Sequence, residues 1–452
     1  MVTFLLHERV FLLNTTLSTS ETMFARRTMA LFLSLPIFTW AMYDFANTIF
    51  SSNVITVFLP FYISEKLGNS EEMNQIASTF ITYSEALASI FLVLFSPLFG
   101  VMIDRTGKKK AYLVPFTLVC VAATLLMGVF ALWQTNHEWL GLQLSLIGVL
   151  VSFVIAKFFY NSGLIFYDAM ISDLGNAREI PVISGYGVAL GYVGTLVGLI
   201  AFLFVTDNHF EYTFIPSALL FLLFALPMFF LYKEQPAALN QAKKSFVSGY
   251  REIWATFKEA RKYQGILLFL FAYFFFNDVI ATAISVMAIY ARTVFGFTTG
   301  QFILLYLVST ISAIIGSFVF GYITRSVGAK LAVTFVSILL MIAVIIAAIA
   351  TVQLFFWIAG SLYGVAMGAM WVTSRTLIVE LTPIEKRGQF FGLFAFSGKV
   401  SSIIGPLIYG TITLLLAESG NLASRVALGS LLILVVIGIM IHVRVPYQKI
   451  TK

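Results

Sequence analysis

The stretch WAMYDFANTIFSSNVITVFLPFYI, residues 40–63, decides the fold class that the sequence predicts. It is apolar and long enough to cross a bilayer, which takes about 20 residues. A carboxylate in a membrane helix costs at least ~2.5 kcal/mol on insertion scales, so it normally faces a wet cavity or a partner. We therefore expect a cavity wall here, with tighter helix packing as the alternative. The helical spacing places four polar residues on one stripe: Asp44, Asn47, Thr48 and Ser51.

The composition predicts an integral membrane protein. The chain has 452 residues, of which 60% are hydrophobic and 11% charged, whereas soluble domains average about 25% charged. The single cysteine, Cys120, excludes a disulfide framework and a multi-cysteine metal site. No phosphate loop, nucleophile elbow or clustered metal ligands occur, so we expect no cofactor, no metal and no enzymatic activity. The net charge of +7 comes from basic residues that flank apolar segments, which indicates topology rather than nucleic-acid binding.

The apolar segments predict an all-α membrane fold with two pseudo-symmetric six-helix bundles. The expected parts are an N-terminal tail (1–31), the first bundle (32–232), a linker with an amphipathic helix (233–264), the second bundle (265–443) and a C-terminal tail (444–452). The twelve expected helices span residues 34–63, 75–103, 111–132, 140–167, 181–206, 212–232, 265–292, 299–324, 329–350, 353–380, 389–416 and 424–443.

Basic residues predict the orientation of the chain in the membrane. If both termini lie in the cytoplasm, most lysines and arginines outside the helices lie on the cytoplasmic side. The loops on the opposite side then hold only three such basic residues, Lys66, Arg292 and Arg425. We expect a bacterial plasma (inner) membrane because the loops are short, and a vacuolar or lysosomal membrane remains open. Apolar residues recur at helical spacing among lysines and arginines of the linker, which predicts a helix lying on an anionic membrane surface. These apolar residues are Phe246, Tyr250, Ile253, Trp254 and Phe257.

Charged residues inside the predicted helices indicate a central polar cavity. The third, sixth, ninth and twelfth helices carry no charge in their apolar spans, whereas the first, second, fourth, seventh, tenth and eleventh do. Asp44, Glu85 and Asp278 are candidate proton carriers, and Arg375 and Lys399 are candidates to bind a carboxylate or phosphate. Mutually neutralising ion pairs are the alternative. The candidate cavity residues are Tyr43, Asp44, Asn47, Glu85, Lys157, Tyr160, Asn161, Asn277, Asp278, Trp371, Arg375 and Lys399, and Asp168 shares a helix face with Lys157.

The two halves repeat a loop pattern. GVMIDRTGKKK, residues 100–110, follows the second helix, and GYITRSVGAK, residues 321–330, follows the eighth. Two six-helix repeats that meet at a midplane site are typical of transporters. This arrangement resembles the major facilitator superfamily, in which the loop's acid and basic residues latch the cytoplasmic side in one state. The matching residues, our candidate gating loop, are Gly100, Asp104, Arg105 and Gly107; in the second copy, Thr324 stands where the acid would be.

A narrower resemblance covers most of the chain after residue 35. Segments such as WAMYDFANTIF (40–50), FAYFFFNDVIATA (271–283) and FFGLFAFSGKVSSIIGPLIYG (390–410) are similar to those of the vacuolar amino-acid effluxer-like, autophagy-related branch. The resemblance implies a secondary transporter, with amino-acid export as the best-known activity. Its typical polar residues match Tyr43, Asp44, Asn47, Tyr160, Asn161, Asn277, Asp278, Ser397, Gly398 and Lys399.

The predicted function is therefore alternating-access transport of a small polar solute. Amino acids or related metabolites are the expected solutes, export is the expected direction, and protons are the expected drive because no nucleotide site is visible. The expected partners are the small-molecule solute, protons and membrane lipids, with no nucleic acid, and we expect a monomer. Two alternatives stay open: a lipid or lysophospholipid flippase of the same fold, and a non-transporting membrane receptor or scaffold.

Overall fold

The computed structural model describes nine parts of the chain: residues 32–68, 70–133, 135, 137–139, 142–175, 180–205, 209–234, 246–382 and 387–446. The predicted N-terminal tail, residues 1–31, lies outside the described residues. So does the end of the predicted C-terminal tail from residue 447 onward.

Within the described residues, twelve helical segments are long and apolar enough to cross a membrane. This confirms the predicted all-α membrane fold. We number them as spans 1 to 12. Spans 1 to 6 are α2 (Leu35–Phe50) with a π-helical stretch η1 (Ser51–Phe58) and α3 (Leu59–Leu67); α4 (Glu71–Thr106); α5 (Lys110–Leu132); α6 (Leu144–Met170); α7 (Ile180–Gly198) with η3 (Leu199–Phe204); and η4 (Phe210–Thr213) with α8 (Phe214–Phe230).

The second bundle follows a linker helix, α9 (Phe246–Ala260). Span 11 is interrupted, whereas spans 7 to 10 and span 12 are single helices. Spans 7 to 12 are α10 (Gln264–Phe295); α11 (Thr299–Val327); α12 (Ala329–Ile349); α13 (Gln353–Leu381); α14 (Arg387–Val400) with η6 (Ser401–Ile403) and α15 (Ile404–Leu415); and α16 (Asn421–Val443). The short elements are η2 (Ile171–Asp173), η7 (Ala417–Ser419) and the antiparallel pair β1 (Glu138–Trp139) and β2 (Leu142–Gln143).

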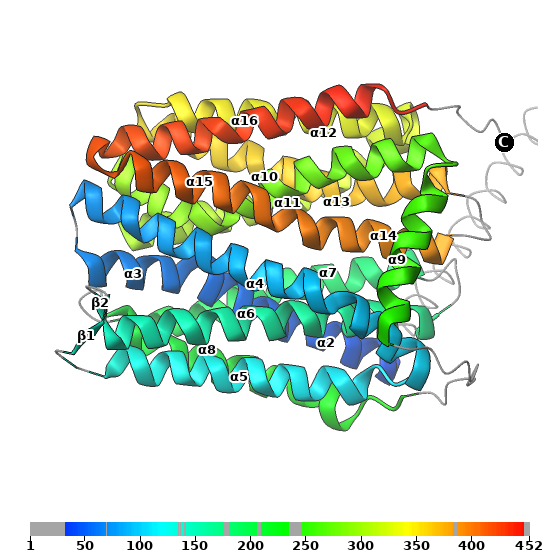
Figure 1. The fold of residues 1–452 in the computed structure, drawn as a ribbon, viewed down its shortest axis with the longest axis horizontal. Helices are drawn as coiled ribbons and strands as arrows, with labels where there is room; N and C mark the ends of the chain where they lie inside the picture. Colours follow the sequence, from blue (N-terminus) through cyan, green and yellow to red (C-terminus); the bar gives the residue numbers. More distant parts are fainter. Residues whose placement is uncertain are drawn as a thin grey trace, which may run out of the picture.

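The two bundles lie side by side with their helices roughly parallel to one axis (Figure 1). Helix α9 crosses one end of the molecule nearly at right angles to the bundles, and β1 and β2 lie at the opposite end. We call these the linker end and the far end. Helix α9 packs against α4, α10 and α14, so it contacts both bundles. Its Tyr250 hydroxyl donates a hydrogen bond to the Leu94 carbonyl of α4, and Trp254 is exposed.

Spans 1 and 7 lie at the centre of the molecule. Within their most apolar windows, 89% of the residues of span 1 and 67% of those of span 7 are buried. Large apolar side chains such as Leu203, Phe230 and Phe318 are exposed on the outer spans, as contact with lipid requires. Glycines allow spans to touch: a Cβ on Gly194 would lie 2.2 Å from the Phe45 carbonyl oxygen. This packing brings the polar faces of the inner spans together.

Candidate functional site

Asp44 lies on α2, half-buried, against a glycine of span 5. Its Oδ1 accepts a hydrogen bond from the Asn47 amide at 3.2 Å, one turn along the same helix. A Cβ on Gly191 of α7 would lie 3.1 Å from Oδ2, so the absence of a side chain there lets the carboxylate approach α7. Asp44 also interacts electrostatically with Asp168 and Arg375. The predicted polar stripe is thus held against span 5 and lies within reach of charges on both bundles.

Tyr43 points into the first bundle. It is buried, its hydroxyl shares a 2.7 Å hydrogen bond with Thr117 of α5, and its ring lies 5.2 Å from that of Tyr167. The neighbouring Trp40 donates from its indole nitrogen to the Tyr167 carbonyl at 3.2 Å. The Tyr43 hydroxyl therefore already has a partner inside the bundle.

Lys157 of span 4 and Glu85 of span 2 form an ion pair. The Lys157 ammonium lies 2.5 Å from Glu85 Oε1, and both side chains are largely buried. Ser285 of α10 donates a hydrogen bond to the other carboxylate oxygen. Glu85 thus joins spans 2 and 4 of the first bundle to span 7 of the second. Because a buried carboxylate that loses a hydrogen-bond donor is destabilised, the Ser285 contact favours the arrangement of the bundles seen here.

Helix α6 presents further polar groups toward the centre. The Tyr160 ring packs 4.9 Å from Phe50, and its hydroxyl interacts electrostatically with Asp44 and Asp168. Asn161 is half-buried beside it. Asp168 is exposed near the linker end of α6 and interacts with Lys399 and Arg375 of the second bundle. Two carboxylates of the first bundle, those of Asp44 and Asp168, therefore face basic groups of the second.

The second bundle supplies two cations. The Arg375 guanidinium is exposed and lies 6.0 Å from the ring centre of Trp371, one turn away on α13, which suits a cation–π contact. Lys399, near the end of α14, is half-buried and interacts electrostatically with Asp168 and Lys157. The acidic groups of Asp44 and Asp168 in the first bundle thus face the basic groups of Arg375 and Lys399 in the second; we call these four residues the charged cluster.

Asn277 and Asp278 are bound to the backbone of span 11. The Asn277 amide donates to the Gly398 carbonyl at 2.8 Å and to the Ser401 hydroxyl at 2.7 Å. Both Asp278 oxygens accept from the Gly405 N–H, at 2.9 and 2.8 Å, and the side chain is fully buried. These two residues therefore contact the interrupted part of span 11.

A row of contacts joins the two bundles toward the far end. Glu65 at the end of span 1 forms an ion pair with Arg292 of span 7. Spans 2 and 12 meet where Ser424 donates to Gln75 at 2.8 Å. Spans 2 and 11 meet through two further hydrogen bonds, each of 2.9 Å: Thr79 with Thr413, and Tyr83 with Thr411. The bundles are thus held together at the far end.

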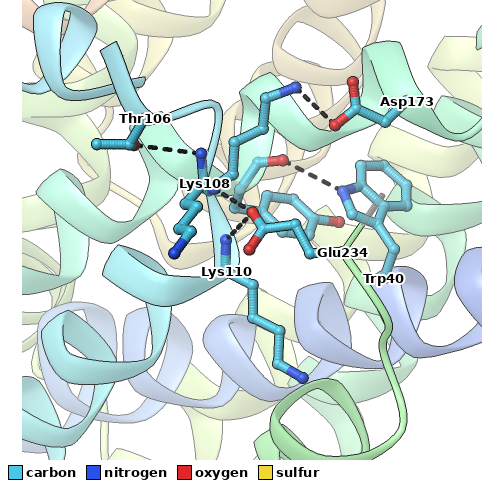
Figure 2. Close-up of polar contacts among 8 residues, drawn as sticks. Trp40, Thr106, Lys108, Lys110, Asp173 and Glu234 are labelled. Carbon is cyan, nitrogen blue, oxygen red and sulfur yellow. Dashed lines mark hydrogen bonds and ion pairs between the residues drawn. The ribbon is translucent and has the colours of Figure 1, made fainter. Parts of the chain in front are cut away.

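The candidate gating loop is tied to the first bundle (Figure 2). The Glu234 carboxylate accepts from the backbone N–H groups of Lys109 and Lys110, the latter at 2.9 Å, and so caps the start of α5. The Lys109 ammonium lies 2.7 Å from Asp173. Gly107 ends α4 with φ +62°, a conformation that glycine adopts without strain. Gly100 lies within α4, and the side chains of Asp104 and Arg105 lie outside the described part of the structure.

The second loop copy shows a related contact. The Lys330 ammonium donates to the carbonyls of Val443 and Val445 at the end of span 12, at 3.1 and 2.6 Å. In the first bundle, the Lys110 ammonium donates to the Tyr232 carbonyl after span 6, at 2.6 Å. In each half, a lysine near the start of the third span therefore binds the carbonyls that follow the sixth span.

A separate apolar cavity of about 120 Å³ lies mainly among spans 7 to 10. Its lining includes Met287, Tyr306, Phe356 and Tyr363, together with Tyr192 of span 5. Tyr192 also interacts electrostatically with Asp44 and Arg375, so it connects this cavity to the charged cluster. Such a cavity has no periodic signal in the sequence, because its lining is apolar like any packed core.

Comparisons with known proteins give consistent matches over most of the chain. The model of a family described as "Vacuole effluxer Atg22 like" matches residues 36–452. The uncharacterized MFS-type transporter YxiO of Bacillus subtilis is 25% identical over 424 residues, which cover 91% of this chain and 95% of that protein. Autophagy-related protein 22 of Kluyveromyces lactis is 25% identical over 373 residues, 74% of each chain.

The fold is similar to that of solved transporters. The nucleoside transporter NupG superimposes with a TM-score of 0.69 over 91% of this chain and 100% of its own, at 12% identity. At that identity the likeness concerns the fold alone. All of these matches are to membrane transporters and not to enzymes.

Proposed function

Because the chain belongs to the vacuole effluxer Atg22-like family of major facilitator transporters, we propose that it exports a small zwitterionic solute. Amino acids or related metabolites are the best candidates, moved by alternating access and driven by protons. The membrane would be a bacterial plasma membrane, with the linker end in the cytoplasm, where the basic residues concentrate.

The observation that supports a zwitterion is the division of charge between the two bundles, with Asp44 and Asp168 on the first and Arg375 and Lys399 on the second. An amino acid carries an ammonium and a carboxylate a few ångströms apart. Its ammonium would lie toward Asp44 and Asp168 of the first bundle, and its carboxylate toward Arg375 and Lys399 of the second. Such a solute links the two bundles by charge, whereas a neutral sugar or nucleoside offers no charge to either bundle.

The contacts between the bundles support a state that is open at the linker end. Ion pairs and hydrogen bonds join the halves toward the far end, from Glu65–Arg292 to Glu85–Ser285. Asp168 and Arg375, nearer the linker end, are exposed. Rocking of one bundle against the other around the charged cluster would break the far-end contacts and admit solvent there.

Asp44 is the best candidate to carry the proton. Of the three acids that the sequence analysis singled out, Glu85 is paired with Lys157, and Asp278 binds a backbone amide. Asp44 instead accepts from a neutral amide, that of Asn47, and interacts with other members of the charged cluster. Its charge is therefore best placed to change with the solute.

Purified protein in liposomes with an internal pH dye tests this proposal. Under an imposed pH gradient, pools of amino acids, short peptides, sugars, nucleosides and lysophospholipids are added in turn. We expect proton movement with an amino-acid pool and none with sugars or nucleosides. Protein carrying Asp44→Asn provides the matched control and should move no protons. Proton movement that only sugars or nucleosides trigger would refute the zwitterion.

The apolar cavity favours a second candidate, an amphiphile such as a lysophospholipid. An acyl chain would lie in the cavity lined by Met287, Phe356 and Tyr363, and its phosphate would bind Arg375 or Lys399. Competition separates the two candidates. Inhibition of transport by amino acids but not by lysophospholipids supports the first, and the reverse supports the second.

A further inference from the structure

Span 11 is broken near its middle. Helix α14 ends at Val400, Ser402 has a non-helical ψ of 32°, and α15 begins at Ile404. Pro406 has no N–H, so the next turn cannot complete the usual helical bonds. A break leaves carbonyl groups before it and amide groups after it without helical partners, and water cannot satisfy them in the bilayer core. Other parts of the chain must therefore bind them.

Asn277 satisfies the end of the first half of span 11. Its amide group donates to the Gly398 carbonyl and to the Ser401 hydroxyl, and that hydroxyl in turn donates to the same carbonyl at 2.9 Å. The last turn of α14 is thus fixed from span 7. Lys399 is the next residue after Gly398, so this turn also sets the position from which the Lys399 side chain extends.

Asp278 satisfies the start of the second half. Both of its oxygens accept from the Gly405 N–H, and the negative charge lies at the N-terminus of α15, where the helix dipole favours it. A Cβ at residue 405 would lie 2.2 Å from Thr282 Oγ1 and 2.8 Å from Asp278 Oδ1. A glycine is therefore needed for span 7 to approach this closely.

We propose that Asn277 and Asp278 form a splint across the break in span 11, and that Asp278 is a positioning residue for Lys399 rather than a proton carrier. Asn277 holds the half of span 11 that bears Lys399, and Asp278 holds the half that follows. The role assigned to Lys399 rests on the proposed function, whereas the splint itself does not. Addition of a proton to Asp278 would remove the negative charge that lies at the N-terminus of α15, where the helix dipole favours it, which argues against a carrier role.

Two substitutions at one position distinguish the splint from a proton carrier. Asp278→Asn keeps an oxygen acceptor for the Gly405 amide, whereas Asp278→Ala leaves that amide unsatisfied. We expect Asp278→Asn to change the KM of gradient-driven transport by no more than about fivefold. Asp278→Ala should raise KM by about tenfold or more. The same Asp278→Ala defect should appear in solute counterflow without a pH gradient, because the splint acts on the site and not on the proton.

A carrier role gives the opposite pattern. If Asp278→Asn and Asp278→Ala both lose gradient-driven transport while both keep counterflow, the splint is refuted. Should Asp278→Ala fail to fold, Asp278→Asn alone decides: retained gradient-driven transport supports the splint, and its loss with intact counterflow overturns it.

A labelling experiment tests the splint without any transported solute. Cys120 is the only cysteine, so Cys120→Ala gives a background in which Lys399→Cys is the single target for a charged thiol reagent. Asp278→Ala should change the modification rate several-fold, and Asp278→Asn should leave it near the parent rate. Ser337→Ala, which removes a buried hydroxyl that donates to the Thr334 carbonyl within its own helix α12, is the matched control and should not change it. An unchanged rate in Asp278→Ala would refute the splint even if no solute is ever found.

Discussion

The two bundles place an acid in the same way and use it differently. In each half, an aspartate of the first span lies against a glycine of the fifth: Asp44 against Gly191, and Asp278 against Gly405. Gly191 lies inside the unbroken helix α7, whose amides bond along the helix, so Asp44 stays available to the charged cluster. Gly405 follows a break, and its amide takes the Asp278 carboxylate. The two repeats therefore keep an aspartate at the same position. What that aspartate binds depends on whether the helix facing it is continuous or broken.

The asparagines sharpen this contrast. Asn53 of span 1 donates to the Gly198 carbonyl at 2.7 Å, where α7 gives way to η3. Asn277 of span 7 donates to the Gly398 carbonyl near the end of α14. Both halves thus bind a glycine carbonyl where the fifth span changes its helical form. In the first half, however, this asparagine is nine residues from the acid, whereas in the second the two are adjacent.

The largest effect is expected from Asp44→Asn, which tests whether Asp44 and Asp278 have different roles. If Asp44 carries the proton, its loss should reduce gradient-driven transport by about 100-fold or more, while counterflow and expression remain. Dye-loaded proteoliposomes measure both activities. The matched control is Asp278→Asn, which should be affected far less. Full gradient-driven transport in the Asp44→Asn protein would remove Asp44 from the proposed mechanism.

The next largest effect concerns the two glycines. Gly405→Ala forces a Cβ to within 2.2 Å of Thr282 Oγ1, whereas a Cβ at Gly191 would lie 3.1 Å from the nearest side-chain atoms. Overpacking costs about 1–3 kcal/mol, and we expect Gly405→Ala near the top of that range and Gly191→Ala near the bottom. Thermal unfolding in detergent measures this difference.

A second substitution checks the cause of the Gly405 effect. Thr282→Ala removes the Oγ1 that the new methyl group would meet, so the double variant should recover part of the lost stability. Equal destabilisation by Gly405→Ala and Gly191→Ala would mean that span 7 does not approach Gly405 more closely than span 1 approaches Gly191.

The third effect concerns the basic and acidic residues proposed to bind the two ends of the solute, and it is measured as a change in KM. Arg375→Gln or Lys399→Gln should raise KM for an amino acid by about tenfold, as expected for a lost hydrogen bond to a charged group. Neither should affect a decarboxylated amine, which lacks the carboxylate. Asp168→Asn should show the reverse dependence, with no effect on an N-acetylated analogue. Uptake competition by the two analogues measures this, and identical analogue profiles for the basic and the acidic substitutions would refute the assigned orientation of the solute.

Much of this architecture could be predicted from the sequence, because it depends on local patterns. Runs of apolar residues mark the twelve spans, and the charges of spans 1, 4, 10 and 11 mark the inner faces. The hydrogen bond that Asp278 accepts from the Gly405 amide could not be predicted, because the two residues lie 127 positions apart in the sequence. The Gly405-Pro406 pair predicts a bend in span 11, but it does not predict which other span packs against that bend. The same holds for Ser285, whose bond to Glu85 crosses 200 residues.

The smallest expected effect tests whether the Glu65–Arg292 ion pair helps to hold the two bundles together at the far end. Glu65 and Arg292 form an ion pair whose side chains are 24% and 21% exposed, so the pair contributes no more than about 1 kcal/mol. Arg292→Gln should therefore shift the balance between states by at most about fivefold. Spin labels at the exposed positions 72 and 418, one on each bundle, would report the shift as a longer distance between them. The charge-swapped pair, Glu65→Arg with Arg292→Glu, should restore the parent distances, since it keeps the attraction. If the swap behaves like the single substitution, the far end is held by the uncharged contacts of spans 2, 11 and 12, and the ion pair plays no part in closing it.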